Sequence, residues 1–237
     1  MKHFFTVFCY FLFFFFAKAQ TSGTITYELK IEEQSYPVQN EFSKKISEDA
    51  KKLEFILDFN NKESLFYCAD AIDNDSNLAL AVSGASEPIY YNFSEKIFLK
   101  NNYLTIYTNE KEFLLKDKVN LKWNITEESK EISGYLCYKA TTKIKKNTSK
   151  GKVEEIVEVW FCPDFPVNIF PKSYVGLPGI IFEVREKFCV FGLKKIHFNT
   201  NPKIPKPLKG KEITEDEYHN IVMERKIEFD KKFKGKK

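Results

Sequence analysis

Histidine, the side chain that enzymes use most in acid–base catalysis, is scarce here, with three copies in 237 residues. One of them, His3, lies in an apolar leader, and the other two, His197 and His219, belong to different predicted elements. Metal sites built from histidine and cysteine have tight local spacing, such as Cys-x2-Cys, which does not occur in this chain. Gly-x-Ser-x-Gly, His-Glu-x-x-His and phosphate-loop motifs are also missing. The sequence therefore indicates no catalytic residues, no metal ligands and no cofactor, although a Cys–His pair could still be assembled from distant positions.

A charge excess of one sign is missing as well. The chain has 37 Lys and Arg residues against 33 Asp and Glu residues, and two of the lysines lie in the first 19 residues. Without that leader the net charge is about +2. A nucleic-acid-binding protein carries a clear basic excess, so the composition argues against that class of partner.

Long apolar runs are lacking everywhere except at the N-terminus, so no transmembrane span is predicted in residues 20–237. The N-terminus has a short basic start, an apolar run at 4–16, and the small-residue site Ala17-Lys18-Ala19, as in a secretory signal peptide. A membrane anchor is the disfavoured alternative, because a spanning helix needs about 20 residues. We predict that residues 1–19 are a signal peptide cleaved before Gln20. The product would be exported to the periplasm, the outer-membrane periphery or the extracellular space.

Aromatic and aliphatic residues are plentiful, and they alternate with polar ones along much of the chain. Ile25, Tyr27, Leu29 and Ile31 fall on one face of a predicted strand, and residues 53–59 repeat the pattern. The short polar gaps between such segments suit hairpins, which predicts an antiparallel meander. The predicted strands are residues 24–31, 53–59, 64–68, 89–93, 97–100, 103–107, 112–116, 122–125, 135–145, 154–161, 180–185 and 188–199.

Two stretches have helical spacing instead. In residues 38–51 the apolar side chains Phe42, Ile46 and Ala50 recur every four positions, which predicts a short surface helix. A C-terminal helix is predicted at about 214–233, because a Thr-x-x-Glu capping box opens it.

The rest of the chain shows no repeat and no low-complexity linker. Residues 20–237 are therefore predicted to form a single, mainly β domain. It would have a large curved antiparallel sheet, as a half-barrel or in two layers, and a few short helices. Asp73-Asn74-Asp75-Ser76 resembles the start of a calcium loop, but the glycine at its sixth place and the glutamate at its twelfth are missing. We therefore prefer an exposed loop or a helix N-terminus there to a metal site.

The most distinctive segment is Gly176-Leu177-Pro178-Gly179, followed by Ile180. Proline fixes φ at the second position of a turn and glycine allows positive φ at the third, so Leu177 to Ile180 fits a type II turn. Gly176 would let the backbone pass close to another group. Leu177 and Ile180, which flank the turn, are expected to pack inward.

With its surroundings, this segment resembles the GLPGLI family of exported proteins, known chiefly from Bacteroidetes. The resemblance extends over about residues 120–185. It departs from the family at Ile180-Ile181, where Leu-Ile is usual, and at Phe170, where Gly precedes Pro. It implies an exported, largely β protein and no known activity. The matching positions are Trp123-Asn124-Ile125-Thr126, Lys130, Ile132-Ser133-Gly134-Tyr135, Cys137, Lys139-Ala140-Thr141, Trp160-Phe161-Cys162-Pro163, Phe165-Pro166-Val167 and residues 176–184.

Four cysteines remain after signal-peptide cleavage, and an even number in an exported chain suggests disulfides, with free buried thiols as the alternative. In a hairpin of residues 135–145 and 154–161, paired positions add up to about 297 to 299. Cys137 and Cys162 would then lie opposite each other or one diagonal step apart, and we predict that they form a disulfide. Cys68 and Cys189 would form a possible second pair or remain free.

Three functions are compatible with this sequence. The leading hypothesis is a non-enzymatic binding protein that holds a lipid, an acyl chain or an apolar peptide segment on an aromatic concave face. Its rival is an accessory protein that docks on an envelope partner through a sheet edge or the C-terminal helix. The third is an enzyme of unknown type, with polar residues that converge on His197 or His219. The basic tail 231–237 is expected to be frayed and solvated, with attraction to anionic lipid as the alternative.

Overall fold

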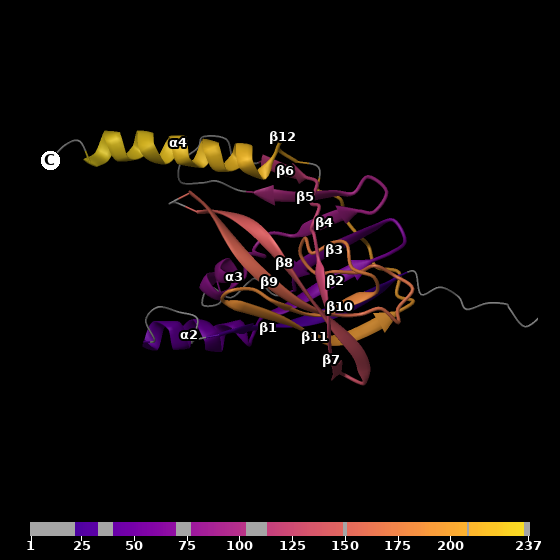
Figure 1. The fold of residues 1–237 in the computed structure, drawn as a ribbon. Coiled ribbons are helices and arrows are strands. Elements are labelled where there is room, and N and C mark those ends of the chain that lie inside the picture. Colours follow the sequence, from indigo (N-terminus) through magenta and orange to yellow (C-terminus); the bar gives the residue numbers. More distant parts are fainter. Residues whose placement is uncertain are drawn as a thin grey trace, which may run out of the picture.

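The structure is a computed structural model that describes residues 22–32, 40–69, 77–102, 113–148, 151–207 and 209–234. The predicted signal peptide and cleavage site, the predicted strand 103–107 and the acidic stretch 73–76 lie outside these residues. The predicted fold class is confirmed: the described part is mainly β, with one large curved sheet and a C-terminal helix (Figure 1).

Twelve strands form the sheet, in the order β12-β6-β5-β4-β3-β2-β1-β11-β10-β9-β8-β7. Neighbouring strands are antiparallel, except that β12 runs parallel to β6. The strands are β1 (Gly23–Ile31), β2 (Glu54–Phe59), β3 (Glu63–Cys68), β4 (Ile89–Asn92), β5 (Ile97–Asn102), β6 (Phe113–Asp117), β7 (Asn124–Ile132), β8 (Tyr135–Thr148), β9 (Gly151–Cys162), β10 (Ile180–Arg185), β11 (Cys189–Phe198) and β12 (Lys211–Ile213).

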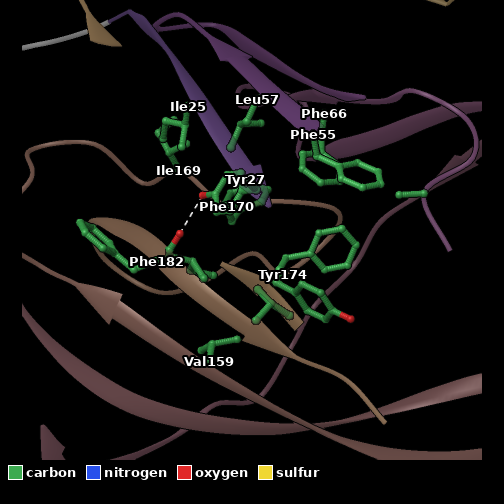
Figure 2. Packing of buried hydrophobic residues seen from close by; sticks show 14 of the residues in the cluster. Ile25, Tyr27, Phe55, Leu57, Phe66, Val159, Ile169, Phe170, Tyr174 and Phe182 are labelled. Carbon is green, nitrogen blue, oxygen red and sulfur yellow. Dashed lines mark hydrogen bonds between the residues drawn. The ribbon is translucent and has the colours of Figure 1, made fainter. Parts of the chain in front are cut away.

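Alternation decides which face of each strand is buried. Ile25, Tyr27, Leu29 and Ile31 of β1 are all buried, as the period-two pattern predicts. Their neighbours on β2 and β11 add Phe55 and Phe191, whose ring centroids lie 5.1 Å apart with the rings edge to face. The main core therefore lies on the inner face of the curved sheet, where many aromatic rings pack against one another (Figure 2).

Two predictions about strands were wrong. The segment 122–125 was expected to be a short strand, but β7 continues through the charged residues 126–132 and forms one edge of the sheet. Apolar and polar residues do not alternate along β7, because both of its faces are mostly exposed. The charges on this edge strand hinder its pairing with other chains. No strand was predicted between residue 199 and the C-terminal helix, but β12 lies there at Lys211–Ile213 and depends on pairing with distant β6.

Strands β8 and β9 make a hairpin much longer than predicted. They remain paired from Tyr138 and Phe161 out to Thr148 and Gly151, whereas a polar loop was expected over 146–152. The outer half of this hairpin, residues 143–156, is mostly exposed or half-buried. We call it the β-arm, and Figure 1 shows it rising from the sheet toward α4.

Three helices accompany the sheet: α2 (Glu41–Ala50), α3 (Asn77–Ser83) and α4 (Glu215–Lys234). The prediction of α2 is confirmed, with Ile46 and Ala50 buried, but Phe42 on the same predicted side is 61% exposed. The predicted C-terminal helix is also confirmed, and Thr214 and Glu217 form its capping box. Helix α3 begins directly after the acidic stretch 73–76, for which we preferred an exposed loop or a helix N-terminus.

Candidate functional site

The glycine-rich turn has the conformation that the sequence predicts. Gly179 has φ of 77° and Gly176 has φ of 104°, both in the left-handed region that favours glycine. A Cβ at Gly179 would lie 1.8 Å from the carbonyl oxygen of Cys162, and a Cβ at Gly176 would lie 3.4 Å from the indole nitrogen of Trp123. Leu177 and Ile180 are buried, as expected. Gly179 is therefore required both by its φ and by the close approach of the Cys162 backbone, whereas at Gly176 the positive φ alone disfavours a side chain, because 3.4 Å is an ordinary contact distance.

Hydrogen bonds hold this turn from several elements. The Trp123 indole donates to the carbonyl of Val175 at 2.7 Å, and the Tyr27 hydroxyl on β1 donates to the carbonyl of Ile181 at 2.7 Å (Figure 2). Ile169 donates its backbone N–H to the carbonyl of Gly179 at 2.8 Å and accepts from the N–H of Ile181 at 3.0 Å. Buried backbone groups need such partners, so the turn has a structural role here.

The segment between β9 and β10, residues 163–179, crosses the inner face of the sheet. We call it the inner segment. Its Phe170 ring lies 5.1 Å from the Tyr91 ring on β4 and 6.2 Å from the Phe98 ring on β5, and all three residues are buried. The aromatic face for which the sequence predicted a lipid or an apolar peptide is thus covered here by the protein itself.

A buried ionic cluster lies at the end of this segment. The Glu186 carboxylate, between β10 and β11, accepts hydrogen bonds from the Lys172 ammonium and from the Tyr174 hydroxyl, the latter at 2.6 Å. Lys172 also donates to the carbonyl of Ser83 at the end of α3, at 3.0 Å. All of these side chains are almost fully buried. We call Lys172, Tyr174 and Glu186 the ionic cluster.

The β-arm is attached to the ionic cluster. Lys146 of β8 reaches the second oxygen of Glu186 at 2.9 Å and Glu155 of β9 at 3.1 Å. Glu155 also accepts from the backbone N–H of Lys187 at 2.9 Å. Two ammonium groups thus face two carboxylates, and the formal charges in this group of contacts cancel.

Electrostatics in the cluster favour a fixed arrangement. Burial alone would raise the pKa of Glu186, but the charges of Lys172 and Lys146 outweigh it and lower the pKa to about 2. Burial and the neighbouring Glu186 carboxylate raise the pKa of Tyr174 well above its usual value of 10.0. Glu186 is therefore charged, and Tyr174 neutral, across the physiological range of pH.

Sequence reasoning missed this cluster. The glycine-rich turn and β10 separate Lys172 and Tyr174 from Glu186 in the sequence, and no motif marks a lysine as buried. The backbone of Lys172 is also unusual, because its φ of 55° is an angle that few non-glycine residues adopt. No sequence signal predicts that angle, because the burial of the side chain and its partners at Ser83 and Glu186 depend on tertiary contacts.

Cys137, Cys162 and Cys189 have free thiols in the structure. Tyr138 pairs with Phe161, so the next positions toward the base of the hairpin are Cys137 and Cys162, and the register sum of 299 is within the predicted range. Both are buried, and their predicted disulfide stays a prediction. Burial raises the pKa of the Cys137 thiol to about 12 and also raises that of Cys162. Neither is a thiolate at neutral pH.

The strand order contradicts the possible second disulfide, between Cys68 and Cys189. Cys68 lies on β3 and Cys189 on β11, and β2 and β1 separate these strands in the sheet. Three inter-strand spacings amount to about 14 Å, whereas disulfide-bonded residues have Cα atoms within about 7 Å. Cys189 instead lies 3.4 Å from the carbonyl of Val82, and burial raises its pKa to about 12.

The two mature histidines are not brought together. His197 lies on β11 in the middle of the sheet, and His219 lies on α4, which contacts β6 near one edge of the sheet. Among the described residues, no group of three or more His, Cys, Asp or Glu side chains is arranged to hold a metal ion. No helix in the described ranges is both long and apolar enough to cross a membrane.

Fold and contacts together define a mainly β protein with an open, bent sheet whose inner face is covered by its own inner segment. A family model described as "Protein of unknown function (Porph_ging)" matches residues 143–183, which include the whole β-arm, the inner segment and the glycine-rich turn. No curated protein matches the chain.

Two solved structures of PNGF-II have a similar fold. The one in space group C2 has a TM-score of 0.54 and 14% sequence identity, and the one in P21 has a TM-score of 0.52 and 16% identity. Each similarity covers 86% of this chain but only 33% or 34% of the solved chain. At such identities the likeness concerns the fold alone.

Proposed function

We propose that this chain is an exported, non-enzymatic protein of the GLPGLI type that serves as an accessory protein at the cell envelope and docks on a partner there. The observation that carries the proposal is the covered inner face: Phe170 occupies the aromatic surface formed by Tyr91 and Phe98. A ligand on that surface would have to displace the inner segment, which the glycine-rich turn and the ionic cluster hold at its end.

Surfaces available for docking lie elsewhere, and the β-arm is the first candidate. It stands out from the sheet, and Ile156 on it is 65% exposed. Chemistry supports a binding role over catalysis, because the raised pKa of Cys189 keeps this thiol protonated at neutral pH, and the raised pKa values of Cys137 and Cys162 do the same wherever these two are reduced.

Photo-cross-linking in the native envelope tests this proposal. Ile156 would be replaced by p-benzoylphenylalanine, and in a control chain Phe42 on α2, which is 61% exposed, would be replaced in the same way. A discrete protein adduct at position 156 and not at position 42 is the expected result.

Purification of the protein from the same envelope preparation distinguishes the lipid-binding hypothesis from the docking proposal. Lipid that co-elutes stoichiometrically, as seen by mass spectrometry, together with no adduct at position 156, would overturn docking in favour of a ligand on the inner face. Absence of both adduct and lipid would also count against docking through the β-arm.

A further inference from the structure

The charge of this protein is concentrated at one end of α4. Residues 225–237 contain seven Lys and Arg residues and two acidic residues, a net charge of +5. Because residues 20–237 together carry about +2, residues 20–224 carry about −3. The first turn of α4, in contrast, is acidic, with Glu215, Asp216 and Glu217. The helix is therefore polarised along its length, and its basic end differs in sign from the rest of the molecule.

Contacts with the body lie at the acidic end of the helix. Asp216 accepts from the Lys152 ammonium at 2.7 Å and from the Asn147 amide at 3.1 Å, both near the tip of the β-arm. The Tyr218 ring lies 5.6 Å from the Phe113 ring of β6, and Ile221 packs near it. These contacts fix the direction in which the helix leaves the sheet.

The basic end extends away from these contacts. Helical structure continues to Lys234, so the tail expected to fray from Lys231 is ordered for one more turn. Ile227 is 50% exposed, and Arg225 and Lys231 are exposed too. Twenty residues of α-helix span about 30 Å, and Figure 1 shows α4 running past the strands to its C-terminal end.

The basic side chains are not confined to one stripe. With about 100° per residue, Arg225 and Lys232 lie on one side of the helix, whereas Lys226 and Lys231 point in two other directions around its axis. A protein groove would need a single apolar or basic stripe. An extended anionic surface acts on all charges within a Debye length, whatever their direction.

From this arrangement we infer that the basic end of α4, residues 225–234, attaches the protein electrostatically to an anionic phospholipid surface. The anchored acidic end and the negative remainder of the molecule then point away from the lipid. The inference rests on the proposed function only in that a location at the cell envelope would bring the protein to anionic lipid. It requires no partner protein.

Vesicle flotation tests the inference with purified protein that lacks residues 1–19. We expect binding to vesicles of phosphatidylglycerol and phosphatidylcholine at low salt, release at high salt, and no binding to phosphatidylcholine alone. Lys231→Glu with Lys232→Glu should weaken the binding at least about tenfold, because each lysine near a charged surface contributes to it. Circular dichroism would verify that the variant keeps its fold.

Lys143→Glu with Lys145→Glu is the matched control, since it makes the same charge change at exposed lysines of the β-arm. An equal loss in this control would show that only net charge matters and would overturn the inference. So would unchanged binding of the α4 variant, salt-independent binding, or stoichiometric competition by inorganic phosphate, which would indicate a single anion site. Vesicles contain no protein, so failure here leaves the cross-linking result at Ile156 untouched.

Discussion

At the scale of single residues, glycines and buried charges matter most in this protein. Gly179 is required by both its φ of 77° and its approach to the Cys162 carbonyl, whereas Gly134 has a similar φ of 82° and open space around its Cα. The turn chemistry was readable from Pro178 and Gly179. The neighbour at Cys162 was not, because the pairing of β9 with β10 places it there.

Gly179→Ala should lower the free energy of unfolding by clearly more than about 1 kcal/mol, which is the cost of a Cβ in a left-handed conformation. The excess comes from the predicted overlap with the Cys162 carbonyl. Gly134→Ala isolates the conformational cost alone. Urea denaturation of both variants measures the difference, and equal losses would contradict the steric argument.

Glu186 makes the stability depend on pH in a defined window. Its folded-state pKa of about 2 lies below the usual 4.5. The contribution of the charged carboxylate to the free energy of unfolding is therefore complete above about pH 4.5 and is lost as the pH falls toward 2. We expect Glu186→Gln to reduce the stability at pH 7 by on the order of 3 kcal/mol. The deficit should shrink over that acidic range, as followed by denaturation at several pH values.

A variant at the partner lysine provides the control for this effect. Lys172→Met leaves Glu186 with Lys146 and Tyr174 as partners, and removal of one partner of a buried pair commonly costs about 3–5 kcal/mol. Its deficit should also shrink in acid. A deficit that is constant between pH 7 and pH 3 in both variants would mean that Glu186 is not charged in the folded protein.

At the scale of elements, the β8–β9 hairpin connects most of the features discussed above. Its inner half belongs to the sheet, its β-arm meets the ionic cluster through Lys146, and its tip meets α4 through Asp216. The hairpin and its register could be predicted, because alternation and the position of the polar loop determine them. The length of the β-arm could not, since its exposed residues carry no alternation of burial.

Cys137 and Cys162 at the base of this hairpin should form a disulfide in the exported protein. Directly opposite residues have Cβ atoms about 4.5–5.5 Å apart, and a disulfide needs about 3.5–4.5 Å, so a small adjustment suffices. Closure of this 26-residue loop should contribute roughly 3 kcal/mol. Peptide mapping of non-reduced, alkylated protein detects the bond.

Reduction supplies the second measurement for this pair. The stability of the wild type should fall on reduction, whereas that of Cys137→Ser with Cys162→Ser should not change. Cys68→Ser with Cys189→Ser is the control and should keep the response to reduction, because those residues lie three strands apart. A free thiol at Cys137 in oxidised protein would sink the prediction.

At the scale of the whole molecule, we predict that the first 19 residues direct the protein to export. The mature N-terminus should be Gln20, recovered either as glutamine or in its cyclised pyroglutamate form. Intact-mass measurement of exported material checks this. Recovery of a chain that still contains residues 4–16 would contradict a cleavable signal peptide and indicate an anchor.

The sequence by itself determined the strand-rich fold class, most strand positions, the glycine-rich turn and the two longer helices. These features depend on local patterns: alternation, four-residue spacing, caps and turn residues, which neighbouring positions in the chain express. The predicted pairing of Cys137 with Cys162 belongs to the same group, because a hairpin register is almost a local property.

Only the tertiary structure decided what lies on the inner face and which charges are buried. Nothing in residues 163–179 marks Phe170 as the ring that covers Tyr91 and Phe98, because those partners are about 70 to 80 positions away. The ionic cluster joins four segments in the same way, and the bent sheet separates Cys68 from Cys189. Such contacts arise from the order of twelve strands, which depends on long-range pairing.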